Sequence, residues 1–140
     1  MPSIGASASM QRMDHSKEDP AETILDKVGD ISKLELTGVQ VLVGTYIRPK
    51  QTKGGILLTD RIRDEDLYQG KTGLVLKVAP GAFVDGDSAD TKFHGFKAQP
   101  GDWIFYGVQD GLSLNINGHH CRIVEDVHVR GRIPNPDMVL

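Results

Sequence analysis

Short runs of alternating apolar and other residues, separated by turn signals, constrain the fold of this chain more than any other feature. From residue 34 onward every strong signal is of this kind, and Asn117-Gly118 is the dipeptide most typical of a two-residue β-hairpin. About five or six short strands with tight turns and no core helix predict an all-β fold, a small antiparallel barrel or sandwich. The runs are VQVLVGTYI at 39–47, GLVLKVA at 73–79, WIFY at 103–106, LSLNI at 112–116 and CRIVEDVHV at 121–129.

A long connection, PKQTKGGILLTDRIRDEDLYQGKTG at 49–73, separates the first two runs. Connections of this length without apolar periodicity are mostly functional or disordered. Its middle holds an apolar triplet directly after a glycine pair, and the triplet needs cover from elsewhere. The cover is either the domain's own core or an apolar groove of a partner, and we favour the partner. The glycine pair and the triplet are Gly54, Gly55, Ile56, Leu57 and Leu58.

The N-terminal 33 residues predict an arm that carries one short helix. Residues 1–18 are small, polar and aperiodic, whereas Asp19 is suited to an N-cap and Pro20 to the first helical position. We expect this helix to dock on its own domain or on a neighbour, and removal of residues 1–30 to weaken assembly more than folding. The predicted apolar face, which ends before Gly29, comprises Ala21, Ile24, Leu25 and Val28.

Composition narrows the functional class. A length of 140 residues predicts one folded body, here residues 34–133, followed by a proline-containing tail at 134–140. A formal net charge of -3 argues against nucleic acid as the main partner. The single cysteine, Cys121, fits a reducing compartment, and no apolar run approaches the roughly 18 residues of a membrane span. We therefore expect a soluble, cytoplasmic protein without membrane contact.

No motif in the chain predicts catalysis or metal binding. Gly70-Lys71-Thr72 resembles the end of a phosphate-binding loop, but Glu65 stands where that loop needs glycine. His119 and His120 would point to opposite faces of a strand, which predicts exposed hairpin histidines rather than a metal site. Cys121 has no cysteine partner and is predicted to be a small core residue. We expect a protein that is not an enzyme and has no metal.

The order of these segments resembles the GroES-type co-chaperonins over roughly residues 39–133. The first strand matches in VLVGTYIRP, the family's mobile loop in TKGGILLTD, and the entry to its roof hairpin in GLVLKVAPG. PGDWIFY follows that hairpin, and CRIVEDVHVRGRI stands in the place of the closing strands. The GGILLT string at 54–59 is the most specific single match.

The resemblance implies a GroES-like β-barrel subunit in a homo-oligomeric ring, a heptamer, that caps a chaperonin and assists ATP-dependent folding. Ile56, Leu57 and Leu58 would insert between apical-domain helices of the GroEL-type chaperonin, with Gly54 and Gly55 as the bend. ATP belongs to the chaperonin, so no cofactor is expected in this chain. Neighbouring subunits would pair the first strand with the terminal strand, which otherwise form exposed edges. The interface residues would be Val39, Val41, Val43, Val127, Val129 and Ile133.

Three features depart from the family pattern and support an alternative. They are the N-terminal extension with its helix, the charged string RIRDEDLYQ in the loop, and the three phenylalanines between 83 and 96. They suggest a phage-encoded or specialised member. The alternative function is a structural or decoration subunit of a virion, with a viral capsid protein as its partner. Zinc-dependent alcohol dehydrogenases also contain a GroES-like domain, but this chain lacks their dinucleotide fingerprint and zinc-ligand cysteines.

Overall fold

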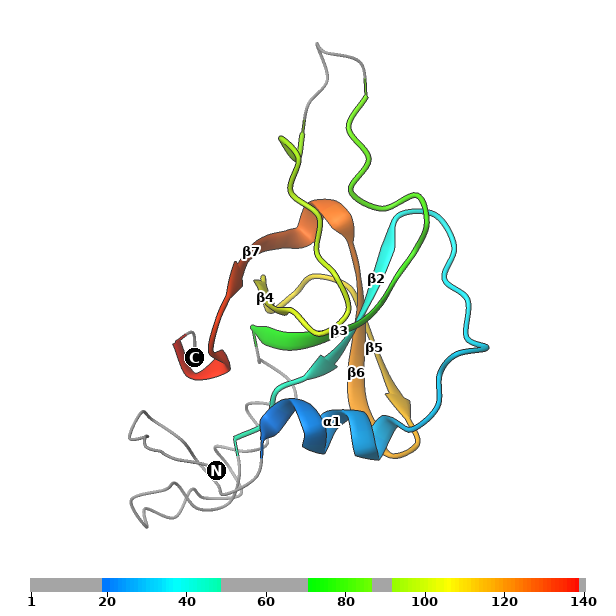
Figure 1. Cartoon of the computed structure of the whole chain (residues 1–140), viewed down its shortest axis with the longest axis vertical. Helices are drawn as coiled ribbons and strands as arrows, with labels where there is room; N and C mark the ends of the chain where they lie inside the picture. The colour runs from blue at the N-terminus through cyan, green and yellow to red at the C-terminus, as the bar shows by residue number, and fades with distance from the viewer. Residues whose placement is uncertain (1–18, 49–70, 87–91, 139–140) are drawn as a thin grey trace, which may run out of the picture.

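The computed structural model describes residues 19–48, 71–86 and 92–138, and Figure 1 shows their arrangement. Strands dominate the described residues, and one short α-helix precedes them, as the sequence predicted. The elements in chain order are α1 (Pro20–Val28), β2 (Gln40–Thr45), β3 (Thr72–Val78), β4 (Trp103–Tyr106), β5 (Leu112–Ile116), β6 (His119–Glu125), the 3₁₀ turn η1 (Asp126–His128), β7 (Val129–Ile133) and the 3₁₀ turn η2 (Pro136–Met138).

The six strands form one antiparallel sheet in the order β5-β6-β2-β3-β4-β7. Strand β2 lies inside this sheet because β3 pairs with one of its sides and β6 with the other. The sequence-based expectation that 39–43 forms an exposed edge is therefore wrong for Val41 and Val43, which are fully buried. The edges of the described sheet are β5 and β7.

The sheet is strongly curled around one of two core clusters. Val124 of β6 and Ile104 of β4 share a cluster although two strands lie between theirs. A flat sheet would hold β6 and β4 about 14 Å apart, yet the Arg122 guanidinium lies 5.6 Å from the centre of the Tyr106 ring. The concave face thus encloses a core of its own, which the base of the 79–101 excursion also enters through Ala82, Phe83 and Ala98.

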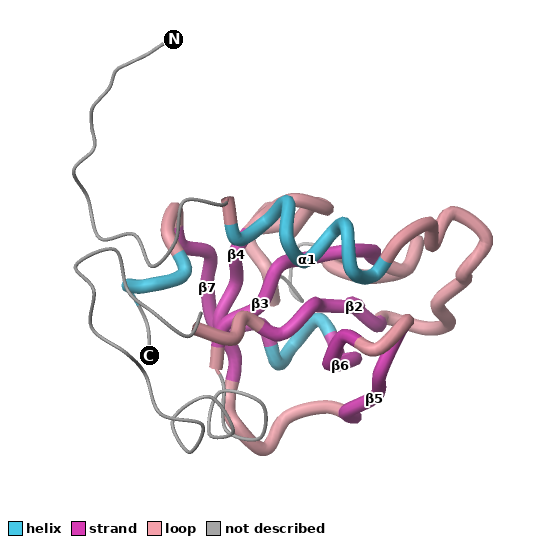
Figure 2. Tube along the Cα trace, turned by 90° about the horizontal axis from the view of Figure 1, so that it is seen from below, coloured by secondary structure: helices cyan, strands magenta, loops and turns pink. Residues whose placement is uncertain are grey.

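Helix α1 covers the opposite face of the sheet (Figures 1 and 2). Asp19 caps it, because its Oδ1 accepts a hydrogen bond from the Ala21 amide at 3.1 Å. Ile24 and Val28 are buried and pack with Leu42, Leu74, Leu76 and Cys121 in the second cluster. The helix approaches so closely that a Cβ placed on Gly44 would lie 2.5 Å from Cγ2 of Ile24. Two apolar layers, one on each face, explain why β2 is buried almost throughout.

Polar contacts fix both the end of α1 and the segment after it. Asn117, in the β5–β6 hairpin turn, donates from Nδ2 to the Val28 carbonyl, while the Lys77 ammonium donates to the Ile31 carbonyl at 2.9 Å. Asn117 and Gly118 have φ values of 50° and 85°, as the predicted hairpin turn requires. Leu25 departs from the predicted apolar face, because half of its surface is exposed. The helix therefore docks on its own chain through Ile24 and Val28.

Candidate partner-binding surfaces

The chain leaves β2 through Thr45 and Tyr46 and enters β3 through Lys71 and Thr72. These two pairs of residues, the stems of the connection between β2 and β3, lie side by side at one end of the sheet. The Tyr46 amide donates to the Thr72 carbonyl at 3.0 Å, and the Tyr106 amide of β4 donates to the Lys71 carbonyl at 2.8 Å. Gly54, Gly55, Ile56, Leu57 and Leu58 lie outside the described residues. Their segment therefore leaves the sheet and returns to it at one place, which three strands hold together.

Side chains from β6 and from the C-terminal turn reinforce these stems. His119 Nε2 lies 3.2 Å from the Thr45 carbonyl oxygen, and His120 Nδ1 lies 2.8 Å from the Thr45 hydroxyl. One residue further on, the Tyr46 hydroxyl donates to Asp137 at 2.7 Å, and its ring meets Trp103 edge to face at 5.6 Å. The residues that lead from β2 into the long connection are thus tied to β6, β4 and η2 together.

His119 corrects the prediction of exposed hairpin histidines, because only 7% of its surface is exposed. The helix α1 and the sheet cover the place where a bare hairpin would meet solvent. Burial lowers the pKa of His119, and the positive charge of Lys27 acts in the same direction. Burial also lowers the pKa of His120, with the Arg122 charge as the second cause.

Acidification is expected to destabilise the fold through these two rings. Above the ordinary histidine pKa of 6.5 both rings are neutral in the folded and the unfolded chain. Below it the unfolded chain binds protons first, so the free energy of unfolding falls as the pH decreases toward the lowered pKa values. Urea midpoints measured from about pH 7.5 to about pH 5 should fall less in His119→Gln, which retains a donor for the Thr45 carbonyl. An equal fall in both proteins would contradict the assignment to His119.

The interior polar groups of β4 and β6 are structural rather than reactive. The buried Arg122 guanidinium donates to the Val108 carbonyl at 2.7 Å and to the Asp110 carbonyl at 2.8 Å, which shapes the β4–β5 connection. Burial raises the pKa of Tyr106 to about 12 and that of the Cys121 thiol to about 11. Cys121 is fully buried, which confirms it as a core residue, and its protonated thiol is a poor nucleophile. Among the described residues no group of three or more histidine, cysteine or acidic side chains is placed to hold a metal ion.

The residues predicted for a subunit interface are divided by the structure into exposed and buried ones. Val127 and Val39 are 49% and 37% exposed, whereas Ile133 is buried and Val129 partly buried. Strand β7 pairs only with β4, so its other side presents unpaired backbone groups in the described part of the chain. Such an edge invites pairing with a further strand.

The excursion between β3 and β4 is held together by an aspartate and an aromatic cluster. Asp85 accepts hydrogen bonds from the amides of Phe93 at 2.7 Å and Gly95 at 3.2 Å, so it joins the two described arms. The bond from the Phe93 amide is the main cause that lowers the pKa of Asp85. The Phe83 ring contacts those of Phe93 and Phe96 edge to face at 5.4 and 5.6 Å. These contacts agree with the predicted hairpin-like shape.

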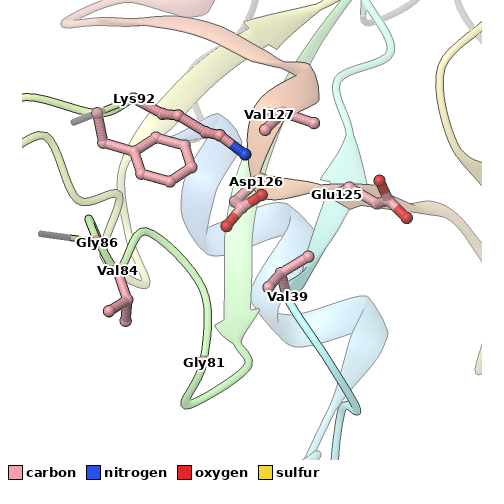
Figure 3. A pocket seen from close by; sticks show the side chains of 9 residues that line it. Val39, Gly81, Val84, Gly86, Lys92, Glu125, Asp126 and Val127 are labelled. Atoms are coloured by element: carbon pink, nitrogen blue, oxygen red, sulfur yellow. The ribbon is translucent and has the colours of Figure 1, made fainter. Parts of the chain in front are cut away.

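A pocket of about 340 Å³ opens between this excursion, the start of β2 and η1 (Figure 3). Exposed valine side chains contribute to its wall from all three segments. Within the pocket, only 5% of the Asp126 surface is exposed, and its carboxylate accepts a hydrogen bond from the Phe83 amide at 3.0 Å. The lining residues are Val39, Gly81, Val84, Gly86, Lys92, Phe93, Glu125, Asp126 and Val127.

A family model described as the chaperonin 10 Kd subunit, Cpn10, matches residues 33–133. The chain belongs to the Cpn10 family. It is similar to the co-chaperonin GroES of Caulobacter sp. (strain K31), with 30% identity over 99 residues, 71% of this chain and 95% of that protein. It is also similar to co-chaperonin GroES 1 of Rhodopirellula baltica, with 24% identity over 94 residues, 67% of this chain and 85% of that protein.

The Cpn10 match begins after α1, although α1 shares a core with the matched sheet. The contacts that sequence reasoning missed are the non-local ones, such as Tyr46 with Asp137 and Thr45 with the two histidines. No local pattern marks a contact between residues 91 positions apart. Among the described helices, none has the length and apolar character needed to cross a bilayer.

Proposed function

We propose that this Cpn10 family member is a co-chaperonin that caps a GroEL-type chaperonin ring and assists ATP-dependent protein folding. The observation that carries the proposal is the Cpn10 match over residues 33–133, which includes the long connection at 49–73. Its relatives bear the name co-chaperonin GroES. In this proposal Ile56, Leu57 and Leu58 bind an apolar groove of each chaperonin subunit, and Gly54 and Gly55 allow the bend that presents them.

The joined stems support this role, because they restrict where each binding segment can reach. A segment that orders only on docking loses conformational entropy, so a single one binds weakly and dissociates readily. Several identical segments on one ring recover affinity through their high effective concentration. A ring can therefore bind firmly and still be released when the chaperonin changes its conformation.

We propose that the ring forms between the free side of β7 and residues 34–38 of the next copy, in place of residues 39–43. Segment 34–38 belongs to no strand ladder of the described sheet. Leu34 and Leu36 pack against the core while Glu35 and Thr37 are exposed, which is the alternation of a strand with one covered face. In Figures 1 and 2 segment 34–38 and β7 lie on opposite sides of the subunit. A contact between two different surfaces of identical subunits generates a ring when the rotation from one copy to the next closes.

Sedimentation velocity and a refolding assay test the proposal in two steps. At micromolar concentration the full chain should sediment as one closed oligomer, for which we expect seven copies. With a GroEL-type chaperonin and ATP, it should increase the yield of a refolded substrate protein over the chaperonin alone. A closed oligomer that neither binds the chaperonin nor changes this yield would contradict the co-chaperonin role.

A further inference from the structure

The pocket in Figure 3 gathers apolar surface that the fold itself leaves uncovered. Val39, Val84 and Val127 all line it and are 37%, 63% and 49% exposed. They make up half of the six large apolar side chains that are exposed among the described residues. Apolar surface that is clustered rather than scattered is typical of an interaction site.

The pocket begins where segment 34–38 ends, next to the proposed contact between copies. Strand β7 has only five residues, so a ladder on its free side would supply few backbone hydrogen bonds. Specific interfaces bury about 800 Å² on each partner, which requires side-chain contacts beyond such a ladder. The pocket is the described apolar surface that directly continues from segment 34–38 through Val39.

Antiparallel pairing, the commoner arrangement of strands, brings the first residues of β7 beside the last residues of segment 34–38. Arg130 is the charged residue at that end of β7. Its side chain is exposed, and within the described residues no hydrogen bond or ion pair holds it. On the pocket side, the exposed Glu125 carboxylate points away from Lys92, whose ammonium lies toward Asp126 (Figure 3). The Glu125 carboxylate also caps η1, where it accepts a hydrogen bond from the His128 amide. A carboxylate can accept several hydrogen bonds, so this one still offers its charge and free lone pairs to a cation from a neighbour.

We propose that the pocket receives Arg130 of the neighbouring copy. The aliphatic part of that side chain covers Val39 and Val127, and its guanidinium pairs with Glu125. An arginine suits this place because its stem is apolar while its head binds a carboxylate with two parallel hydrogen bonds. The inference rests on the ring contact in the proposed function and assigns the pocket to self-assembly.

A charge exchange tests it, with assembly of the full-length protein read by sedimentation velocity over a concentration series. Glu125→Arg and Arg130→Glu should each raise the concentration needed for assembly by about tenfold or more, and the double variant should restore assembly. Arg130 is exposed and caps no turn, so the thermal melt of Arg130→Glu should match the wild type. Glu125→Arg loses the cap of η1 and should melt slightly lower, by the same amount in the single and in the double variant. Asp26→Arg, an exposed change of the same charge on α1, should assemble normally.

Singles that assemble like the wild type would overturn the inference, and so would a double variant no better than the singles. A wild-type chain that stays monomeric would overturn the ring contact together with this inference. The variant Leu57→Ser/Leu58→Ser separates chaperonin binding from ring assembly. That variant should form rings normally and lose only the chaperonin, so its result does not depend on Arg130.

Discussion

Replacing Leu57 and Leu58 by serine is expected to abolish chaperonin binding and to leave the melting temperature of the protein nearly unchanged. In the proposed function these side chains are buried only in the partner, where each leucine contributes roughly 1.5–3 kcal/mol. The loss recurs in every copy of a ring, so the summed effect on binding is far larger than the effect on one arm. A pull-down with a GroEL-type chaperonin and a thermal melt on the same preparation measure both quantities.

Leu112→Ser is the matched control, because Leu112 is 65% exposed on the edge strand β5 and lies outside the long connection. It should leave both binding and melting temperature close to the wild type. A double serine variant that melts many degrees lower would show that the triplet packs into its own domain. Substitution of core leucines costs about 2–5 kcal/mol each, so the two cases are well separated.

Loss of α1 is expected to unfold the domain and not merely to weaken its assembly. Ile24 and Val28 are 4% and 1% exposed, and without them the Leu42, Leu74 and Leu76 side chains would meet water. Ile24→Ala alone should lower the free energy of unfolding by about 2–5 kcal/mol. Deletion of residues 1–30 should remove an amount comparable to the whole stability of a small domain, about 5–15 kcal/mol.

Urea denaturation of Ile24→Ala and Leu25→Ala compares a buried and a half-exposed position of one helix. Leu25→Ala should change the free energy of unfolding by only about 0.5 kcal/mol. The burial of Ile24 reverses the expectation from sequence that removing residues 1–30 affects assembly more than folding. A truncated protein with wild-type urea midpoint would instead support a dispensable arm.

Local signals in the sequence determined much of this fold correctly. Asp19 followed by Pro20 set the start of α1, and Asn117-Gly118 set the β5–β6 turn. Both act through the backbone conformation of a few adjacent residues, so no distant contact is needed to read them. The all-β class followed in the same way from alternating runs, and the order of segments led to the Cpn10 family.

The tertiary structure alone decided which strands are edges and which faces are covered. Alternation in 39–43 shows that a strand exists, but not that β3 and β6 occupy both of its sides. Burial of His119 depends in the same way on the Thr45 carbonyl and on the nearby helix, both far away in sequence. Strand partners and helix docking are fixed by packing between distant segments, because only the assembled core makes those contacts favourable over their loss of chain entropy.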